Sequence, residues 1–124
     1  NGDELVEKLK EIAVKEDIPF ASVSGIGAVG SAVTGYFDTA ERRFKSSELT
    51  GDLEIVSLCG IINKMNGEAY LHLHMSIADE SGRVYGGHLS KAVISGTGEI
   101  VLHCIDAETD RCFDEETGLN IIKF

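Results

Sequence analysis

Short runs of β-branched and apolar residues, separated by glycine-bearing turns, constrain this chain more than any other feature. From Phe20 onward such runs recur around residues 20–24, 31–37, 53–62, 69–78, 83–90 and 99–106. Runs of this length with turn residues between them are typical of β-strands. The spacing therefore predicts a mostly antiparallel β-sheet.

One helix is expected before the strands. Leu5, Leu9, Ile12 and Ala13 form the i, i+4, i+7, i+8 stripe of an amphipathic helix over residues 2–16, with capping side chains at residues 1 and 3. Pro19 ends this helix because the residue before a proline is pushed out of the helical region. The expected fold is α+β, with one long N-terminal helix packed on the sheet.

The size and apolar content of the chain fit one packed domain. The chain has 124 residues, of which 43% are hydrophobic, so we expect a single domain over residues 1–124. Residues 53–62 carry apolar side chains at both odd and even positions, which predicts a central strand covered on both faces.

The charge balance opposes some classes of partner. With 11 basic and 21 acidic residues, the net charge of −10 repels phosphate backbones and anionic lipid. The basic cluster of Arg42, Arg43 and Lys45 fits a solvated loop better than an anion contact. The acidic segment 106–118 also predicts a solvated loop.

Cysteine usage and hydropathy point to the reducing interior of a cell. Cys59, Cys104 and Cys112 are too few and too unevenly spaced for a disulfide framework, and no C-x-x-C pair is present. No apolar run approaches the ~18 residues of a membrane span, and residues 1–10 lack the pattern of a signal peptide. We expect a soluble, cytoplasmic protein that does not interact with membranes.

The segment from Gly25 to Gly30 satisfies the G-x-G-x-x-G pattern of dinucleotide-binding proteins. A Rossmann site also needs a helix directly after the glycines, and residues 31–38 are instead β-branched and interrupted by Gly35. We therefore expect no nucleotide cofactor, and glycines that serve positive φ or close backbone packing.

The segment 71–77 alternates strictly between apolar and polar residues, so His72 and His74 share the polar face of one strand. The turn after it, residues 79–82, suits a three-residue hairpin loop that pairs Asp79 with Arg83. Paired residue numbers then sum to 162. This register places His74 opposite His88 and keeps apolar residues on the other face, with Leu73 opposite Leu89, whereas a shift by one residue would mix the two faces.

Three histidines therefore meet on one polar surface: His72, His74 and His88. Three neutral imidazoles with an open fourth position are the ligand set of many catalytic zinc sites, so we expect a metal site. Zinc is the preferred occupant, and nickel or iron would accept the same donors. The alternative is a polar sheet face whose histidines hydrogen-bond to neighbours or to another subunit. His103 is expected to be an ordinary strand residue.

Several segments along nearly the whole chain carry a family resemblance. The matching segments are Ser24-Gly25-Ile26-Gly27-Ala28-Val29, Gly35-Tyr36-Phe37-Asp38, Glu54-Ile55-Val56-Ser57-Leu58, His72-Leu73-His74 and Gly82-Arg83-Val84-Tyr85-Gly86-Gly87-His88-Leu89. In this order and spacing they resemble the plants-and-prokaryotes conserved (PPC) domain.

The resemblance implies an α/β sandwich-like domain that assembles as a homotrimer. Prokaryotic members usually stand alone and are called predicted DNA-binding proteins, whereas plant members carry AT-hook segments. This sequence has no Arg-Gly-Arg-Pro hook, and its net charge makes direct DNA binding unfavourable. Family members usually have a short strand before the segment matching residues 2–5, so we expect that a first strand is missing here.

The preferred function is that of a stand-alone homotrimeric PPC module that acts in binding or regulation. The alternative is a zinc-dependent enzyme that acts on a small anionic substrate through the three histidines, with Arg83 or Arg111 as the anion partner. Direct DNA binding ranks third.

Overall fold

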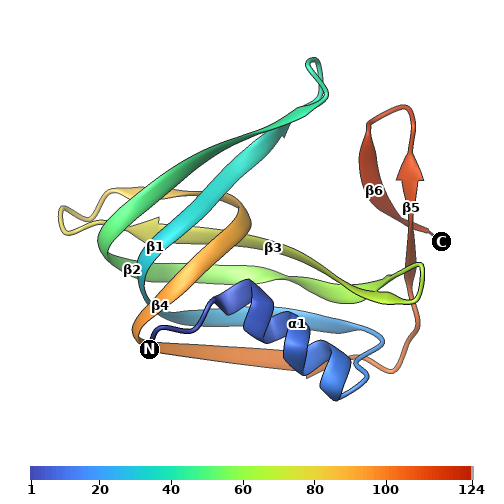
Figure 1. The fold of residues 1–124 in the computed structure, drawn as a ribbon, viewed down its shortest axis with the longest axis horizontal. Helices are drawn as coiled ribbons and strands as arrows, with labels where there is room; N and C mark the ends of the chain where they lie inside the picture. The colour runs from blue at the N-terminus through green and yellow to red at the C-terminus, as the bar shows by residue number, and fades with distance from the viewer. Residues whose placement is uncertain (124) are drawn as a thin grey trace.

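A computed structural model describes residues 1–123 (Figure 1). One helix, α1 (Leu5–Lys15), precedes six strands. The strands are β1 (Ala21–Asp38), β2 (Arg43–Met65), β3 (Glu68–Ala78), β4 (Val84–Cys104), β5 (Asp110–Asp114) and β6 (Leu119–Lys123). The first four form a closed antiparallel barrel, and β5 and β6 form a separate hairpin. The expectation of a mostly antiparallel sheet with a helix packed on it is confirmed.

The barrel strands are longer than the sequence runs suggested. The runs 20–24 and 31–37 belong to one bent strand, β1, because the glycines between them lie at bulges and not in a turn. Gly27 adopts a φ of 144°, and a Cβ there would lie 2.4 Å from the carbonyl oxygen of Thr97 on β4. Glycine therefore permits the close strand contact at this bend.

The helix is shorter than predicted and has a different cap. It begins after Glu4, whose carboxylate accepts hydrogen bonds from the backbone N–H of Val6 (3.2 Å) and Glu7 (2.8 Å). Asn1 and Asp3 do not cap it, because the chain before Glu4 pairs with β4: the Gly2 N–H donates to the Ile94 carbonyl, and the Ile94 N–H donates to the Asp3 carbonyl. The prediction of one long helix over residues 2–16 was therefore wrong in its length and its start.

The core fills the barrel and the space under α1. The largest fully buried side chains include Val29, Leu58, Ile62, Leu73, Met75 and Ile77. On β2, Leu53 and Ile55 also point inward, whereas Glu54, Val56 and Cys59 are exposed. The prediction that residues 53–62 are covered on both faces was thus wrong for the single chain, since one face of this strand is open along much of its length.

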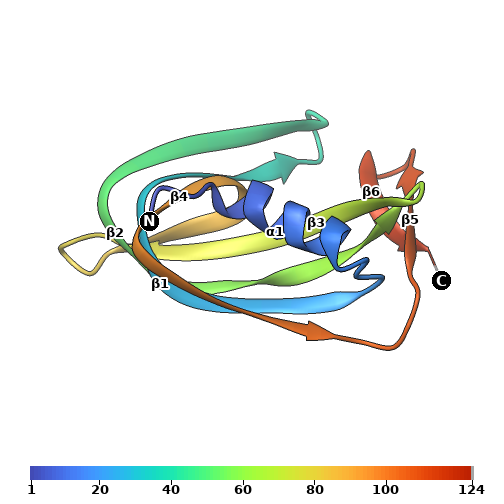
Figure 2. The same cartoon turned by 60° about the horizontal axis from the view of Figure 1, so that its bottom comes forward.

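The acidic tail is not a simple loop. Within residues 106–118, which were expected to be solvated, β5 begins at Asp110 and pairs with β6. Figure 2 shows this hairpin beside one end of the barrel. Arg111 is buried there, so the hairpin is anchored and does not extend freely into solvent.

All three cysteines are free and exposed. Among residues 1–123, no helix combines the length and apolarity that crossing a membrane requires.

Candidate metal centre

The β3–β4 hairpin has the predicted register over its paired length. His74 is opposite His88, and Ile77 is opposite Tyr85. Pairing between the strands ends at the two histidines, so Leu73 and Leu89 do not face each other as predicted; Leu89 instead pairs with Thr34 of β1. The departure arises because β4 leaves β3 at this point and closes the barrel against β1.

Asp79 holds the turn that sets this register. Its carboxylate accepts hydrogen bonds from the Ser81 N–H (2.8 Å), the Ser81 hydroxyl (2.6 Å) and the Arg83 N–H (3.1 Å). The hydrogen bond from the Ser81 hydroxyl is the main reason that the pKa of Asp79 is lowered. The Asp79 N–H donates to the Arg83 carbonyl at 3.0 Å. These bonds confirm the predicted three-residue loop and its closing pair.

The three predicted site histidines lie together on the outer face of the barrel wall. Their ring centroids are separated by 5.3 Å (His72–His74), 5.2 Å (His72–His88) and 5.6 Å (His74–His88). One ring nitrogen from each lies within 4.8 Å of the others. The structure therefore brings together all three residues that the sequence nominated.

Close backbone packing places His88 in the cluster. Its neighbour Gly87 has a φ of 151°, and a Cβ there would lie only 2.4 Å from the Gly35 carbonyl oxygen of β1. On its other side, the His88 ring meets the Phe44 ring edge to face, with centroids 5.5 Å apart. Glycine thus lets β4 approach β1 while the adjacent imidazole turns outward.

The surroundings favour neutral imidazoles. Burial lowers the pKa of His72, and the nearby His88, Arg111 and His74 lower it further. Burial also lowers the pKa of His88, with a smaller contribution from His74. Neutral imidazole is the form that binds metal, and the lowered pKa values of His72 and His88 favour that form for these two side chains.

The donor chemistry of the cluster fits a divalent metal. No protein group among residues 1–123 donates a hydrogen bond to, or accepts one from, the three rings. One nitrogen from each ring lies within 4.8 Å of the others, and three imidazole nitrogens are the protein ligand set of many catalytic zinc sites. His72, His74 and His88 would hold such an ion and leave one position open.

A second polar cluster lies beside the histidines on the same face of β3. Tyr70 precedes His72 by two residues, and the Arg111 guanidinium carbon lies 4.6 Å from the centre of the Tyr70 ring. Arg111 donates from Nε to Asn63 Oδ1 and from Nη1 to the Asn120 carbonyl, both at 2.8 Å. The sequence reasoning missed Tyr70, although it continues the alternation of His72 and His74.

The other candidate residues lie outside this site. Arg83 sits in the exposed hairpin turn and does not join the cluster. Lys45 of the basic cluster forms ion pairs with Asp38 (2.6 Å) and Glu41 (3.1 Å), and Arg43 pairs with Glu41 as well. Acidic neighbours thus offset this positive charge.

Two further features do not form part of the site. His103 is exposed on β4, opposite Ser22 of β1. The segment 25–30 lies inside β1, so it lacks the strand-to-helix turn of a dinucleotide fingerprint.

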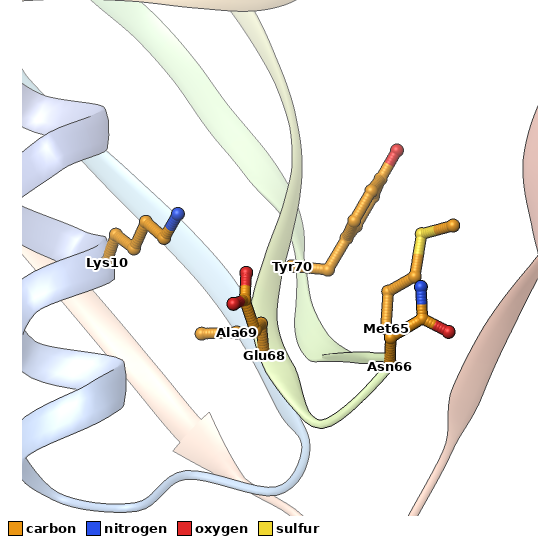
Figure 3. A pocket seen from close by; sticks show the side chains of 6 residues that line it. All are labelled: Lys10, Met65, Asn66, Glu68, Ala69 and Tyr70. Carbon is orange, nitrogen blue, oxygen red and sulfur yellow. The ribbon is translucent and has the colours of Figure 1, made fainter.

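A cavity of about 440 Å³ lies at the β2–β3 turn and is separate from the histidines. It is lined by Lys10, Met65, Asn66, Glu68, Ala69 and Tyr70 (Figure 3). In Figure 3 the Tyr70 side chain points away from α1, whereas Lys10 extends from α1 on the other side of β3. Tyr70, His72 and His74 occupy alternate positions of β3, so Tyr70 lies on the face that carries the histidines.

Comparison with known sequences adds a family assignment to this geometry. Residues 1–106 match the Plants and Prokaryotes Conserved (PCC) domain, which is the family named above as PPC. The chain is also 32% identical over 103 residues to the bifunctional protein GlmU of Synechococcus sp. (strain JA-3-3Ab). That match covers 82% of this chain but only 15% of the length of GlmU.

Three crystal structures are similar over nearly the whole chain. A provisionally assigned DNA-binding protein of Bacteroides thetaiotaomicron has a TM-score of 0.97 and 31% identity, covering 100% of this chain and 87% of that one. A PPC protein of Pyrococcus horikoshii has a TM-score of 0.92 and 31% identity, covering 100% and 86%. A protein of Archaeoglobus fulgidus described as metal-containing has a TM-score of 0.88 and 37% identity, covering 97% and 85%.

Proposed function

Since this chain belongs to the PCC domain family, we propose that it is a homotrimeric module for binding or regulation, with a zinc site at His72, His74 and His88. The observation that carries the metal site is the convergence of three imidazole nitrogens within 4.8 Å, on rings without protein hydrogen bonds among residues 1–123. A zinc ion there would act as a Lewis acid on the ligand in its fourth position. The A. fulgidus relative described as metal-containing supports this assignment.

The open face of the barrel supports the trimer. Val56 on β2 and Val101 on β4 are 52% and 62% exposed, and Ile26 on β1 is 56% exposed. Apolar side chains on one sheet face are typical of surfaces that another subunit covers. A subunit packed on this face would also explain why both the odd and the even positions of residues 53–62 are apolar, which the single chain does not explain.

A metal-dependent enzyme is the second candidate. Three histidine ligands leave one coordination position free, as in catalytic zinc sites. The two functions can be separated by incubating the zinc-loaded protein with a small molecule that it binds. An enzyme releases this molecule chemically changed, whereas a binding module releases it intact.

Two measurements test the main proposal. Protein purified without an affinity tag or chelator, then supplied with zinc and desalted, is expected to keep about one zinc per chain by elemental analysis. Light scattering at micromolar concentration is expected to give about 40 kDa, three times the 13.3 kDa of one chain. Protein that retains no zinc refutes the metal site, and a mass near 13 kDa refutes the trimer.

A further inference from the structure

Arg111 is a buried cation without an acidic partner. Its residue surface is 5% exposed, yet none of the ion pairs among residues 1–123 includes it. The Asn63 side chain and the Asn120 carbonyl that accept its hydrogen bonds are neutral. Buried arginines are almost always paired with an anion. A chain with 21 acidic residues that leaves this one unpaired points to an anion from outside.

The position of Arg111 links it to the histidines. It stacks on Tyr70, which lies two residues before His72 on the same face of β3. Since side chains two residues apart on a strand share a face, the guanidinium that stacks on Tyr70 lies on the side of β3 that carries the proposed metal centre.

Two hydrogen-bond donors remain available beside the centre. Arg111 uses Nε and Nη1 for protein hydrogen bonds, whereas Nη2 has no protein acceptor among residues 1–123. The Tyr70 hydroxyl accepts from Asn120 Nδ2 at 3.3 Å, so its own O–H is free to donate. A guanidinium nitrogen and a hydroxyl match the two oxygens of a carboxylate.

We propose that the three-histidine metal site binds a small carboxylate ligand. One end of this ligand contacts the metal, and a carboxylate group of the ligand accepts hydrogen bonds from Arg111 and Tyr70. This inference rests on the proposed function, because it needs the metal at the three histidines. A carboxylate fits better than a phosphate, since the cluster offers only two free donors, Arg111 Nη2 and the Tyr70 hydroxyl. Phosphate sites usually add several backbone N–H groups or further cations.

Cobalt-loaded protein provides the test, because visible absorption of Co²⁺ responds to a change of ligand. Malonate, which carries two carboxylates, is expected to change the spectrum with saturation at pH 7.5, whereas the uncharged malonamide leaves it unchanged. Inorganic phosphate is expected to bind more weakly than malonate. Phosphate that binds as tightly as malonate, with the same dependence on Arg111, refutes the carboxylate class.

Two variants connect the spectral change to the proposed residues. Arg111→Gln is expected to weaken malonate binding by at least about tenfold, and Tyr70→Phe, which keeps the ring under the guanidinium, by about threefold to tenfold. Both are expected to bind Co²⁺ within about twofold of the parent protein, as neither residue is a metal ligand. If Arg111→Gln fails to fold, Tyr70→Phe alone decides.

The outcomes separate the two proposals. If the protein binds Co²⁺ but malonate does not change its spectrum, the carboxylate inference is overturned and the metal site is not. The same holds if the folded variants bind malonate as tightly as the parent protein. Protein that binds no metal overturns both.

Discussion

The anchoring of the β5–β6 hairpin can be tested by replacing Asn63 with leucine. Asn63 is fully buried and joins β2 to the tail through two hydrogen bonds, one from Arg111 Nε (2.8 Å) and one to Thr109 Oγ1 (3.1 Å). Leucine keeps the branched shape of asparagine but can make neither bond, and it is the larger side chain. The change therefore removes the polar anchoring and adds some crowding at a fully buried position.

The expected cost follows from these two contacts. A hydrogen bond to a charged group contributes about 1.5–3 kcal/mol, and one between neutral groups about 0.5–1.5 kcal/mol. Their sum is about 2–4.5 kcal/mol, and the apolar leucine offsets part of it. Since β5 and β6 form a two-stranded sheet of their own within residues 1–123, the loss is expected mainly as local opening of the hairpin.

Amide hydrogen exchange is the appropriate assay. A local loss of 2 kcal/mol or more raises exchange in peptides covering residues 110–123 about thirtyfold, while residues 69–78 of β3 stay protected. Thr109→Val is the matched control, because it removes only the weaker bond and is expected to raise exchange by about tenfold or less. Exchange of the hairpin in Asn63→Leu within threefold of the parent protein would refute this account of its anchoring.

Three further predictions concern the site and its partners. His74→Ala is expected to abolish zinc retention in elemental analysis. The same change is expected to alter the unfolding free energy of the metal-free protein by no more than about 0.5 kcal/mol, because His74 is exposed and forms no hydrogen bond among residues 1–123. The lowered pKa values of His72 and His88 mean that the unfolded chain binds more protons than the folded chain below about pH 6.5. The metal-free protein should therefore lose stability in urea unfolding as pH falls from 6.5 through the lowered pKa values, and a flat profile between pH 7.5 and 5 would contradict the burial of these rings. Mobility shifts at physiological salt are expected to show no complex with A·T-rich duplex DNA, because the net charge is −10. A sub-micromolar, salt-sensitive complex would show that a local basic surface overrides the effect of the net charge.

The candidate site was predictable from the sequence because its information is local. Strict alternation placed His72 and His74 on one face, and the composition of the turn set the register that brought His88 opposite His74. The prediction for Leu73 and Leu89 failed because the exit of β4 toward β1 depends on barrel closure, which no local pattern encodes.

The remaining errors also came from long-range contacts. The runs 20–24 and 31–37 were expected as separate strands with a glycine-bearing turn between them, but pairing with two neighbouring strands keeps β1 continuous through its bulges. The acidic tail suggested a solvated loop, because nothing in its own composition shows that Arg111 is buried against Asn63 and Tyr70. The helix start moved to Glu4 since residues 2 and 3 pair with β4.

The connectivity of the barrel has a consequence for the order of folding. Closure joins the first barrel strand to the last, with Ala21 paired to Cys104, so it requires contacts between distant parts of the chain. Such contacts form slowly, because the entropy of closing a long loop is lost before the contacts stabilise it. The three histidines, in contrast, lie within the single β3–β4 hairpin. A metal ion bound to them would stabilise this hairpin before the barrel closes, so that zinc would accelerate folding as well as stabilise the finished protein.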